Sequence, residues 1–275
     1  MYRLQRRLLS RQRKFSQNFL VNRKLVQRLI RGSSISSKDL VLEIGPGQGM
    51  ITQELLEVAR EVIAIELDDQ LYGQLQHKFG HNDKLIAVHS DFLTMSLPPG
   101  LYKVFANIPF SITGDVVRKL LQSSNPPRDA YLVMQSEAAS KFIVHPGSST
   151  MAAMHYFPWW NIQIVHRFQR QDFSPQPKVE SVLLHIQPRP LPLISIEQIG
   201  LYWDFVAYHF THDRFAKFVP ASKWLSLFEN FLHSPQKMKT VRGSFIKLQH
   251  QQNALERIHR TRTDKNWRNF KNLLS

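Results

Sequence analysis

The sequence predicts an α/β protein with an open sheet, followed by a smaller region built from helices. Over the first two thirds of the chain, short apolar runs typical of buried strands alternate with amphipathic stretches of helical period. After a proline-rich run at 188–192, helical patterns dominate. The 275 residues suffice for one large domain, or for one medium and one small domain. We therefore expect a basic arm at 1–14, a sheet domain at 15–190 and a helical domain at 191–275.

The elements follow in order. Asn22 is expected to begin a helix at 22–31, and Gly32 to end it. The expected strands lie at 40–44, 62–65, 85–89, 101–106, 130–134, 162–168 and 182–186. Helices between them are expected at 51–58, up to residue 79, at 113–122 and at 136–143, and beyond the proline run at 196–210, 224–232 and 241–258.

Charge is unevenly distributed along the chain. Residues 1–38 hold eleven Lys or Arg and no acid, and residues 181–275 carry +8. Of the total of +15, this leaves −4 for the centre at 39–180. Basic ends around a mildly acidic centre favour a polyanion, and nucleic acid in particular, over an anionic membrane surface. The basic residues of the arm are Arg3, Arg6, Arg7, Arg11, Arg13 and Lys14, which we expect to contact phosphates. A mitochondrial targeting segment is the alternative for residues 1–14.

The chain contains no cysteine, which excludes Cys-ligated zinc, iron–sulfur clusters and thiolate catalysis. This absence fits a reducing compartment, and we expect a cytoplasmic protein without a metal. No apolar run approaches the roughly 18 residues that are needed to span a bilayer.

A glycine-rich turn, Gly45-Pro46-Gly47-Gln48-Gly49, connects the strand at 40–44 to the next helix. Such a turn suits a ligand that lies over a helix start. A dinucleotide fingerprint needs a further glycine where Met50 stands, so a nicotinamide cofactor is disfavoured. A structural loop is the alternative.

Polar residues follow three successive strands. Glu66 ends the strand at 62–65, where a carboxylate can accept the hydroxyls of a ribose. Asp91 follows the next strand and can accept from an adenine amino group, with Phe92 against the ring. Either carboxylate can instead cap a helix.

Asn107-Ile108-Pro109-Phe110 closes the next apolar run. The Asn107 amide and the Ile108 carbonyl can accept hydrogen bonds from an exocyclic amine, and Phe110 can stack on a base. A β-turn nucleated by Asn and Pro is the alternative. Because all these strand ends meet at one edge of an open sheet, we expect a ligand site there.

The order of these motifs resembles the ribosomal RNA adenine N6-dimethyltransferases over nearly the whole chain. The motifs are 15–20 (with Gln17-Asn18-Phe19), the glycine-rich turn, Glu66, Asp91, 107–110 and the proline-stiffened loop 173–181. Within that family, the motif with Ile108 and Phe110 resembles the corresponding motif of the erythromycin-resistance branch. Members of that branch modify an adenine in 23S ribosomal RNA.

The resemblance implies a Rossmann-like domain with a mixed, mostly parallel seven-stranded sheet, and a small helical C-terminal domain. It also implies S-adenosylmethionine as methyl donor, held by Asn18, Leu20, Gly45, Glu66, Asp91 and Asn107. Asn107, Ile108, Pro109 and Phe110 would form the catalytic stretch, with Phe173 as a second aromatic near it. The implied partner is 23S ribosomal RNA before or during ribosome assembly, with resistance to macrolide antibiotics as the consequence. We expect a monomer that binds no membrane.

Two alternatives remain open at this point. One is the small-subunit branch, which methylates 16S-type RNA during ribosome maturation. The other is a non-catalytic nucleic-acid-binding relative, similar to the mitochondrial transcription factors of this fold.

Overall fold

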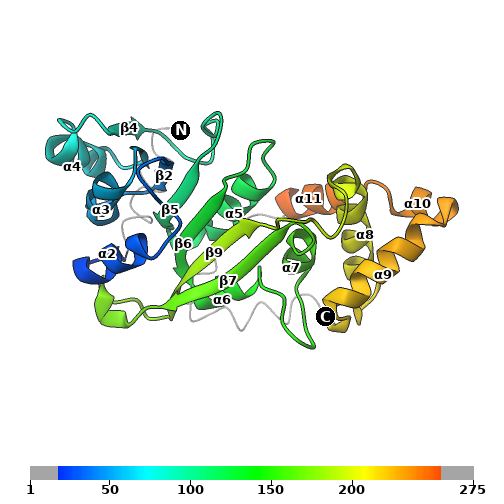
Figure 1. The fold of residues 1–275 in the computed structure, drawn as a ribbon. Helices are drawn as coiled ribbons and strands as arrows, with labels where there is room; N and C mark the ends of the chain where they lie inside the picture. The colour runs from blue at the N-terminus through cyan, green and yellow to red at the C-terminus, as the bar shows by residue number, and fades with distance from the viewer. Residues whose placement is uncertain (1–17, 255–275) are drawn as a thin grey trace.

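The computed structural model describes residues 18–254, which are built around a seven-stranded sheet (Figure 1). Across the sheet the strand order is β4-β3-β2-β5-β6-β9-β7. The strands are β2 (Leu40–Ile44), β3 (Glu61–Glu66), β4 (Leu85–His89), β5 (Lys103–Asn107), β6 (Asp129–Gln135), β7 (Trp160–Arg167) and β9 (Ser181–Pro188). All pairs from β4 to β6 are parallel, while β9 runs antiparallel to both β6 and β7. The mixed, mostly parallel sheet is therefore confirmed.

Apolar residues alternate between the two faces of the sheet, so both faces are buried. One face carries Leu42, Val104 and Leu132, and it packs into the larger core with Val117 of α5 and Tyr202 of α8 (Ile199–His212). The opposite face carries Val41, Phe105 and Val133, and it packs against α2 and α3. The helices of this part are α2 (Arg23–Arg31), α3 (Met50–Val58), α4 (Asp69–Phe79), α5 (Thr113–Leu121), α6 (Ser136–Ser140) and α7 (Met151–Tyr156). These layers make a three-layer α/β/α arrangement.

A second, two-stranded sheet ties the start of the described chain to a later loop. Its strands are β1 (Phe19–Leu20) and β8 (Phe173–Ser174), which pair antiparallel. Leu20 is directly opposite Phe173, and both side chains are buried. The segment before α2 is therefore held against the loop that precedes β9.

The chain beyond β9 is helical, as the sequence predicts, and it packs at one end of the sheet (Figure 1). Its helices are α8 (Ile199–His212), α9 (Ala221–Leu232), α10 (Pro235–Val241) and α11 (Ser244–Ala254). The single helix expected at 241–258 was wrong in its described part: Gly243 has φ +81° and separates α10 from α11. The Asp204 carboxylate accepts from the N–H groups of Gly243 (2.8 Å) and Phe245 (2.9 Å), which stabilises the break. The helix expected at 136–143 also ends early, at Ser140.

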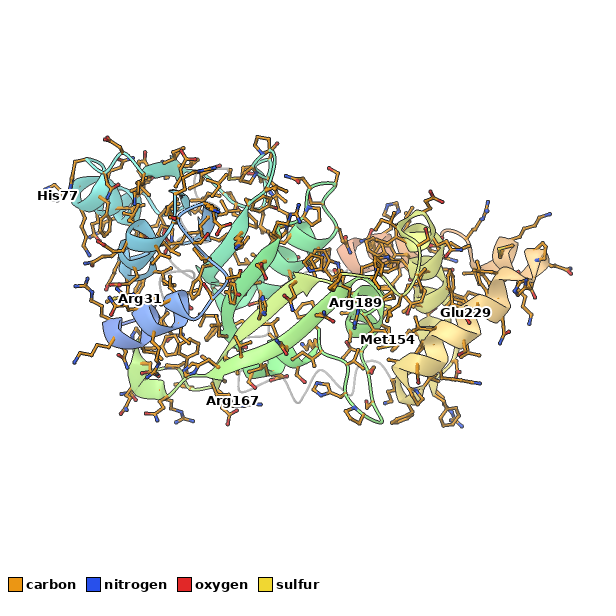
Figure 2. The ribbon with its side chains drawn as sticks, viewed as in Figure 1. Arg31, His77, Met154, Arg167, Arg189 and Glu229 are labelled. Carbon is orange, nitrogen blue, oxygen red and sulfur yellow. The ribbon has the colours of Figure 1, made fainter. Side chains whose placement is uncertain are left out.

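Buried contacts join α7 to the helical region. Figure 2 shows Met154 and Arg189 at this junction, and Met154 is fully buried there. The Trp203 indole donates to the His155 carbonyl (3.0 Å), and His155 Nε2 lies 3.2 Å from the Trp203 carbonyl. Burial lowers the pKa of His155 to about 4, so the ring is neutral at pH 7 and packs without a buried charge.

Within residues 18–254, no helix has the length and apolar character that crossing a membrane requires.

Candidate active site

The predicted polar strand ends lie at one edge of the sheet. β2, β3, β4 and β5 are neighbouring parallel strands, so their carboxyl ends share that edge. Glu66 is the last residue of β3 and Asn107 the last of β5, while Gly45 follows β2 and Asp91 follows β4 by two residues. A Cβ atom on Gly45 would lie 3.9 Å from Pro109 Cδ. The glycine-rich turn and the 107–110 stretch therefore lie next to each other, with about the space of one methyl group between Gly45 and Pro109.

The Asn107 amide is held in place by a residue 89 positions earlier. Its Nδ2 donates to the backbone carbonyl of Asn18 at 2.8 Å. Because only the nitrogen of an amide donates, this bond sets which way the group faces. No donor from the described residues bonds to Asn107 Oδ1. The oxygen is thus an oriented acceptor.

The next three residues form a rigid corner after β5. Ile108 is buried and its N–H donates to the Val133 carbonyl (3.0 Å). Pro109 has φ −56° and its carbonyl accepts from Ile112 N–H (3.0 Å), which begins a 3-10 turn at Phe110–Ile112. The Ile108 carbonyl receives no hydrogen bond from the described chain, and the Phe110 ring is half-buried. Two acceptors and an accessible ring face therefore occur within four residues.

The glycine-rich turn leaves no room for a side chain at Gly47 or at Gly49, where a Cβ would lie 2.5 Å from Phe79 Cε2. Gly47 has φ +56°, and a Cβ there would lie 2.7 Å from Phe19 Cε1. Phe19 of β1 therefore packs directly on the turn. Gly45 N–H donates to the Ile65 carbonyl (2.9 Å), which anchors the turn to β3. The backbone at Gly45 is half-buried with space beside its Cα atom, whereas an aromatic ring shields the backbone at Gly47.

The Glu66 carboxylate accepts more hydrogen bonds from the protein than the sequence suggests. Its buried carboxylate accepts from the N–H groups of Gly47 (3.1 Å), Leu67 (2.8 Å) and Asp68 (2.9 Å). Burial raises the pKa of Glu66, and these three hydrogen bonds counteract the rise. A carboxylate has about four acceptor positions, so little capacity remains, mainly on Oε2. Glu66 holds the glycine-rich turn, and its role as a ribose acceptor stays a prediction.

Asp91 keeps one carboxylate oxygen available. Its Oδ1 accepts from Leu93 N–H (2.9 Å), while Oδ2 has no partner in the described residues. Lys119 of α5, which sequence reasoning missed, donates to the carbonyls of Phe92 and Met95 and lies 4.8 Å from the centre of the Phe92 ring. Lys119 thereby fixes the loop that carries Asp91. A lysine in an amphipathic helix that also carries Arg118 gives no sequence signal for such a role.

Leu20 and Phe173 are brought next to the site by the β1–β8 pair, but their side chains face the core. Phe173 is 2% exposed and packs against Phe168, with ring centres 5.3 Å apart. A base cannot stack on it in this conformation, so contact between Phe173 and a target base stays a prediction. The predicted phosphate contacts of the arm, Arg3 to Lys14, lie outside the described residues.

A second carboxyl lies beneath the turn and was also missed. Glu43 of β2 is 1% exposed; Thr52 donates to its Oε2 (2.6 Å), and Oε1 has no partner. Burial raises the pKa of Glu43 to about 8, and the nearby Glu66 adds to the rise. Glu43 therefore carries a proton at neutral pH. The sequence signal was present, since Glu43 precedes the turn inside an apolar run typical of a buried strand, but no role was expected for it.

The site fits S-adenosylmethionine on its own chemistry. There is space beside the backbone of Gly45. Asp91 Oδ2 and Asn107 Oδ1 are acceptors without a partner in the described residues, and S-adenosylmethionine carries amino and hydroxyl donors. Asp91 Oδ2 can accept from its adenine amino group. No group of three or more His, Cys, Asp or Glu residues that could hold a metal occurs in the described residues.

Comparisons with known proteins agree with this reading. A family model described as ribosomal RNA adenine dimethylase matches residues 9–216. Ribosomal RNA small subunit methyltransferase A of Clostridium botulinum (strain Loch Maree / Type A3) is 31% identical over 209 residues, which cover 72% of this chain and 74% of that protein. The mitochondrial ribosomal RNA small subunit methyltransferase of Arabidopsis thaliana is 34% identical over 188 residues, which cover 66% and 49%.

Among solved structures, the 23S rRNA methyltransferase ErmE superposes with a TM-score of 0.69 at 27% identity. The match covers 77% of this chain and 98% of that one. The chain therefore belongs to the ribosomal RNA adenine dimethylase family and is an S-adenosylmethionine-dependent rRNA adenine methyltransferase.

Proposed function

We propose that this enzyme methylates N6 of a specific adenine in 23S ribosomal RNA and thereby confers resistance to macrolide-type antibiotics. The observation that carries the chemistry is the Asn107 amide, whose bond to Asn18 leaves Oδ1 as an oriented acceptor beside the Ile108 carbonyl. The choice of 23S RNA is supported by Ile108 and Phe110, and by the similarity to ErmE along nearly all of that chain.

The chemical obstacle is the amine, because its lone pair is delocalised into the purine ring. S-adenosylmethionine supplies an electrophilic methyl group, so the enzyme's task is mainly positioning. Hydrogen bonds from the two amino protons to Asn107 Oδ1 and the Ile108 carbonyl favour a pyramidal nitrogen. Its lone pair is then directed at the methyl group. The nitrogen becomes acidic once it attacks, so no strong general base is required.

Phe110 holds the target base by stacking. An adenine must leave its stack to reach the pocket, which costs a few kcal/mol. Stacking on an aromatic ring returns about 1–3 kcal/mol. Looped or single-stranded RNA lowers the cost of unstacking and is the favoured substrate.

On the donor side, we assign Asn18, Leu20, Gly45, Glu66, Asp91 and Asn107 to the binding of S-adenosylmethionine. The contribution of Leu20 is through its backbone, since the side chain is buried. Titration calorimetry with S-adenosylmethionine tests the assignment: Asp91→Asn should weaken binding about tenfold, because a charged acceptor is lost. Unchanged affinity would remove Asp91 from the donor site.

We assign RNA binding to the basic arm and to α8–α11, in a monomeric enzyme. Reversing the charges of Arg3, Arg6, Arg7 and Arg11 should weaken RNA binding and reduce its salt dependence by up to about three in the slope of log K against log salt. The measurement is fluorescence anisotropy of a labelled RNA at several salt concentrations. An unchanged slope would show that the arm does not contact phosphates.

A second candidate is methylation of small-subunit RNA. It is favoured by the curated relatives, such as those of Clostridium botulinum and Arabidopsis thaliana, which are named small subunit methyltransferases. Primer extension on 23S and 16S RNA from cells that express the enzyme separates the two. We expect a new stop in 23S RNA that a variant with Asn107→Ala does not produce; a stop in 16S RNA alone would contradict the 23S proposal.

A further inference from the structure

Two aromatic rings in the helical region lie outside the core. Among all the Phe, Tyr and Trp side chains of residues 18–251, Phe215 and Phe218 alone are exposed, at 58% and 52%. Neighbouring rings of the same region, such as Phe205, Trp224 and Phe228, are buried and pack edge to face or tilted against one another. Folding of this region therefore does not require the two exposed rings.

A cation lies over each exposed ring. The Arg214 guanidinium is 4.8 Å from the centre of the Phe215 ring, and Lys217 Nζ is 5.0 Å from the centre of the Phe218 ring. A cation occupies one face of a ring and leaves the other face open to a flat partner. The same cations attract phosphates. Aromatic rings interleaved with basic side chains are the composition with which proteins bind single-stranded nucleic acid.

The segment that carries the rings is fixed before any ligand binds. Asp213 Oδ1 accepts from Phe215 N–H (2.8 Å), and Phe218 N–H donates to the Phe215 carbonyl (2.9 Å). Ala216, between the rings, is 1% exposed and anchors the turn in the core. Little conformational freedom is left to lose on binding.

A hydrogen bond connects this turn to the segment between α6 and α7, which follows β6. β6 runs parallel to β5, so the chain after Gln135 leaves the sheet at the same edge as Asn107. The segment after α6 folds back on itself, with the Thr150 hydroxyl bonded to the Lys141 carbonyl. Ser149 N–H then donates to the Lys217 carbonyl at 2.7 Å. In Figure 1 the turn between α8 and α9 accordingly lies on the same side of the molecule as the segment between α6 and α7.

We propose that Phe215 and Phe218 form a stacking platform for unpaired nucleotides of the RNA segment that carries the target adenine, with Arg214 and Lys217 contacting their phosphates. This inference rests on the proposed function, because it assigns part of the same RNA substrate. It adds a second aromatic contact to Phe110 and accounts for selection of looped over paired RNA.

The test uses the full chain and a short RNA hairpin whose loop contains one adenine, with 2-aminopurine on either side of it. The variant with Phe215→Leu and Phe218→Leu keeps the apolar character of the surface and removes the aromatic faces. We expect quenching of 2-aminopurine to be lost and the Kd for the hairpin to rise about 5- to 150-fold. Affinity for a fully paired RNA of equal length should change less than about twofold.

Leu101→Ala is the matched control, because Leu101 is an exposed apolar residue (68%) that lies before β5 at the amino edge of the sheet, outside α8–α11. It should bind the hairpin as the wild type does, and calorimetry should give all three proteins the same affinity for S-adenosylmethionine. Wild-type affinity and quenching in the leucine variant would overturn the platform. So would an equal loss on paired RNA, or self-association of the wild type that the leucine variant abolishes in sedimentation.

Failure of the platform differs from failure of the proposed function. If the wild type transfers methyl groups to the loop adenine and the leucine variant does so with equal kcat/KM, only the platform is wrong. If the wild type neither binds nor methylates the hairpin, both the platform and the proposed function are wrong.

Discussion

At the amino edge of the sheet, the Asp129 carboxylate is bonded to His185 (2.7 Å) and Ser34 (2.9 Å); at the carboxyl edge, Asn107 keeps its oxygen free. Lys103 pairs with Asp39 (3.1 Å) at the amino edge in the same self-contained way. A cavity of about 550 Å³ lies there, but its two carboxylates are both paired. Polarity alone therefore does not mark a site. The difference is whether acceptors remain unbonded and oriented.

The carboxyls of Asp129 and Glu43 also differ in their hydrogen bonding, and their pKa values shift in opposite directions. Burial tends to raise the pKa of Asp129, but hydrogen bonds from His185 and Ser34 outweigh it, so the pKa lies below its usual value. The pKa of Glu43, which has one bonded oxygen, is raised to about 8. Asp129 thus stabilises the fold when ionised, whereas ionisation of Glu43 costs stability.

The largest effect is expected from Asn107→Ala. It removes the oriented acceptor, and loss of one preorganised hydrogen-bonding group typically lowers kcat about 10²- to 10³-fold. RNA affinity should survive, since phosphate contacts are untouched. Initial rates of tritium transfer and anisotropy measure the two quantities.

Asn161→Ala is the matched control, because Asn161 is also a half-buried strand asparagine but lies on β7, the edge strand three positions away from β5. It should keep wild-type kcat. Equal losses in both variants would mean that the carboxyl edge has no special role.

Glu43→Gln should raise the free energy of unfolding relative to the wild type as the pH rises, by roughly a few kcal/mol between pH 4.5 and pH 8. In the wild type, the free energy of unfolding falls as pH rises from about 4.5 to about 8, because the unfolded chain releases the Glu43 proton first. The neutral variant does not lose stability in this way. The difference between its free energy of unfolding and that of the wild type should therefore grow across that range and level off above pH 8. Urea unfolding at pH 5, 6.5 and 8 measures it.

Glu57→Gln, on the exposed side of α3, is the control and should follow the wild type. A Glu43→Gln curve parallel to the wild type would show that Glu43 is ionised in the folded protein.

Asp129→Asn is expected to have the smallest effect and no effect on catalysis. It should cost about 1–3 kcal/mol of stability near pH 7, because a nearly buried charged hydrogen bond is lost. The difference from wild type should shrink as pH falls below about 4, where the lowered pKa of Asp129 is approached. Unfolding in urea from pH 3 to 7 measures this change. The contribution of Asp129 to the free energy of unfolding rises with pH, whereas that of Glu43 falls. A changed kcat would contradict the division between the two edges.

Much of the fold could be predicted from sequence because each strand is a short apolar run between polar turns. The break at Gly243 was not predicted, because it depends on Asp204, which caps the next helix from about 40 residues away. At the site, residue types and strand ends were predictable. The bond between Asn107 and Asn18, and the packing of Phe19 on Gly47, bring together segments far apart in the chain and have no local signal.

The proline-stiffened loop illustrates the same limit. Its motif directs attention to Phe173, but pairing of β8 with β1 buries that ring. Conversely, Phe215 and Phe218 occur in an ordinary apolar stretch, and only their exposure distinguishes them.

The position of the transferred methyl group directly tests whether Asn107 orients N6 of an adenine for methylation. The enzyme is incubated with S-adenosylmethionine that carries tritium in the methyl group and with the unlabelled adenine-loop hairpin, and the RNA is digested to nucleosides. Label should appear in N6-methyladenosine or N6,N6-dimethyladenosine, and its initial rate of appearance should be about 10²- to 10³-fold lower with Asn107→Ala. Label on another atom of adenine or on another base, or an equal rate with the Asn107→Ala variant, would contradict the role of Asn107 in N6 methylation.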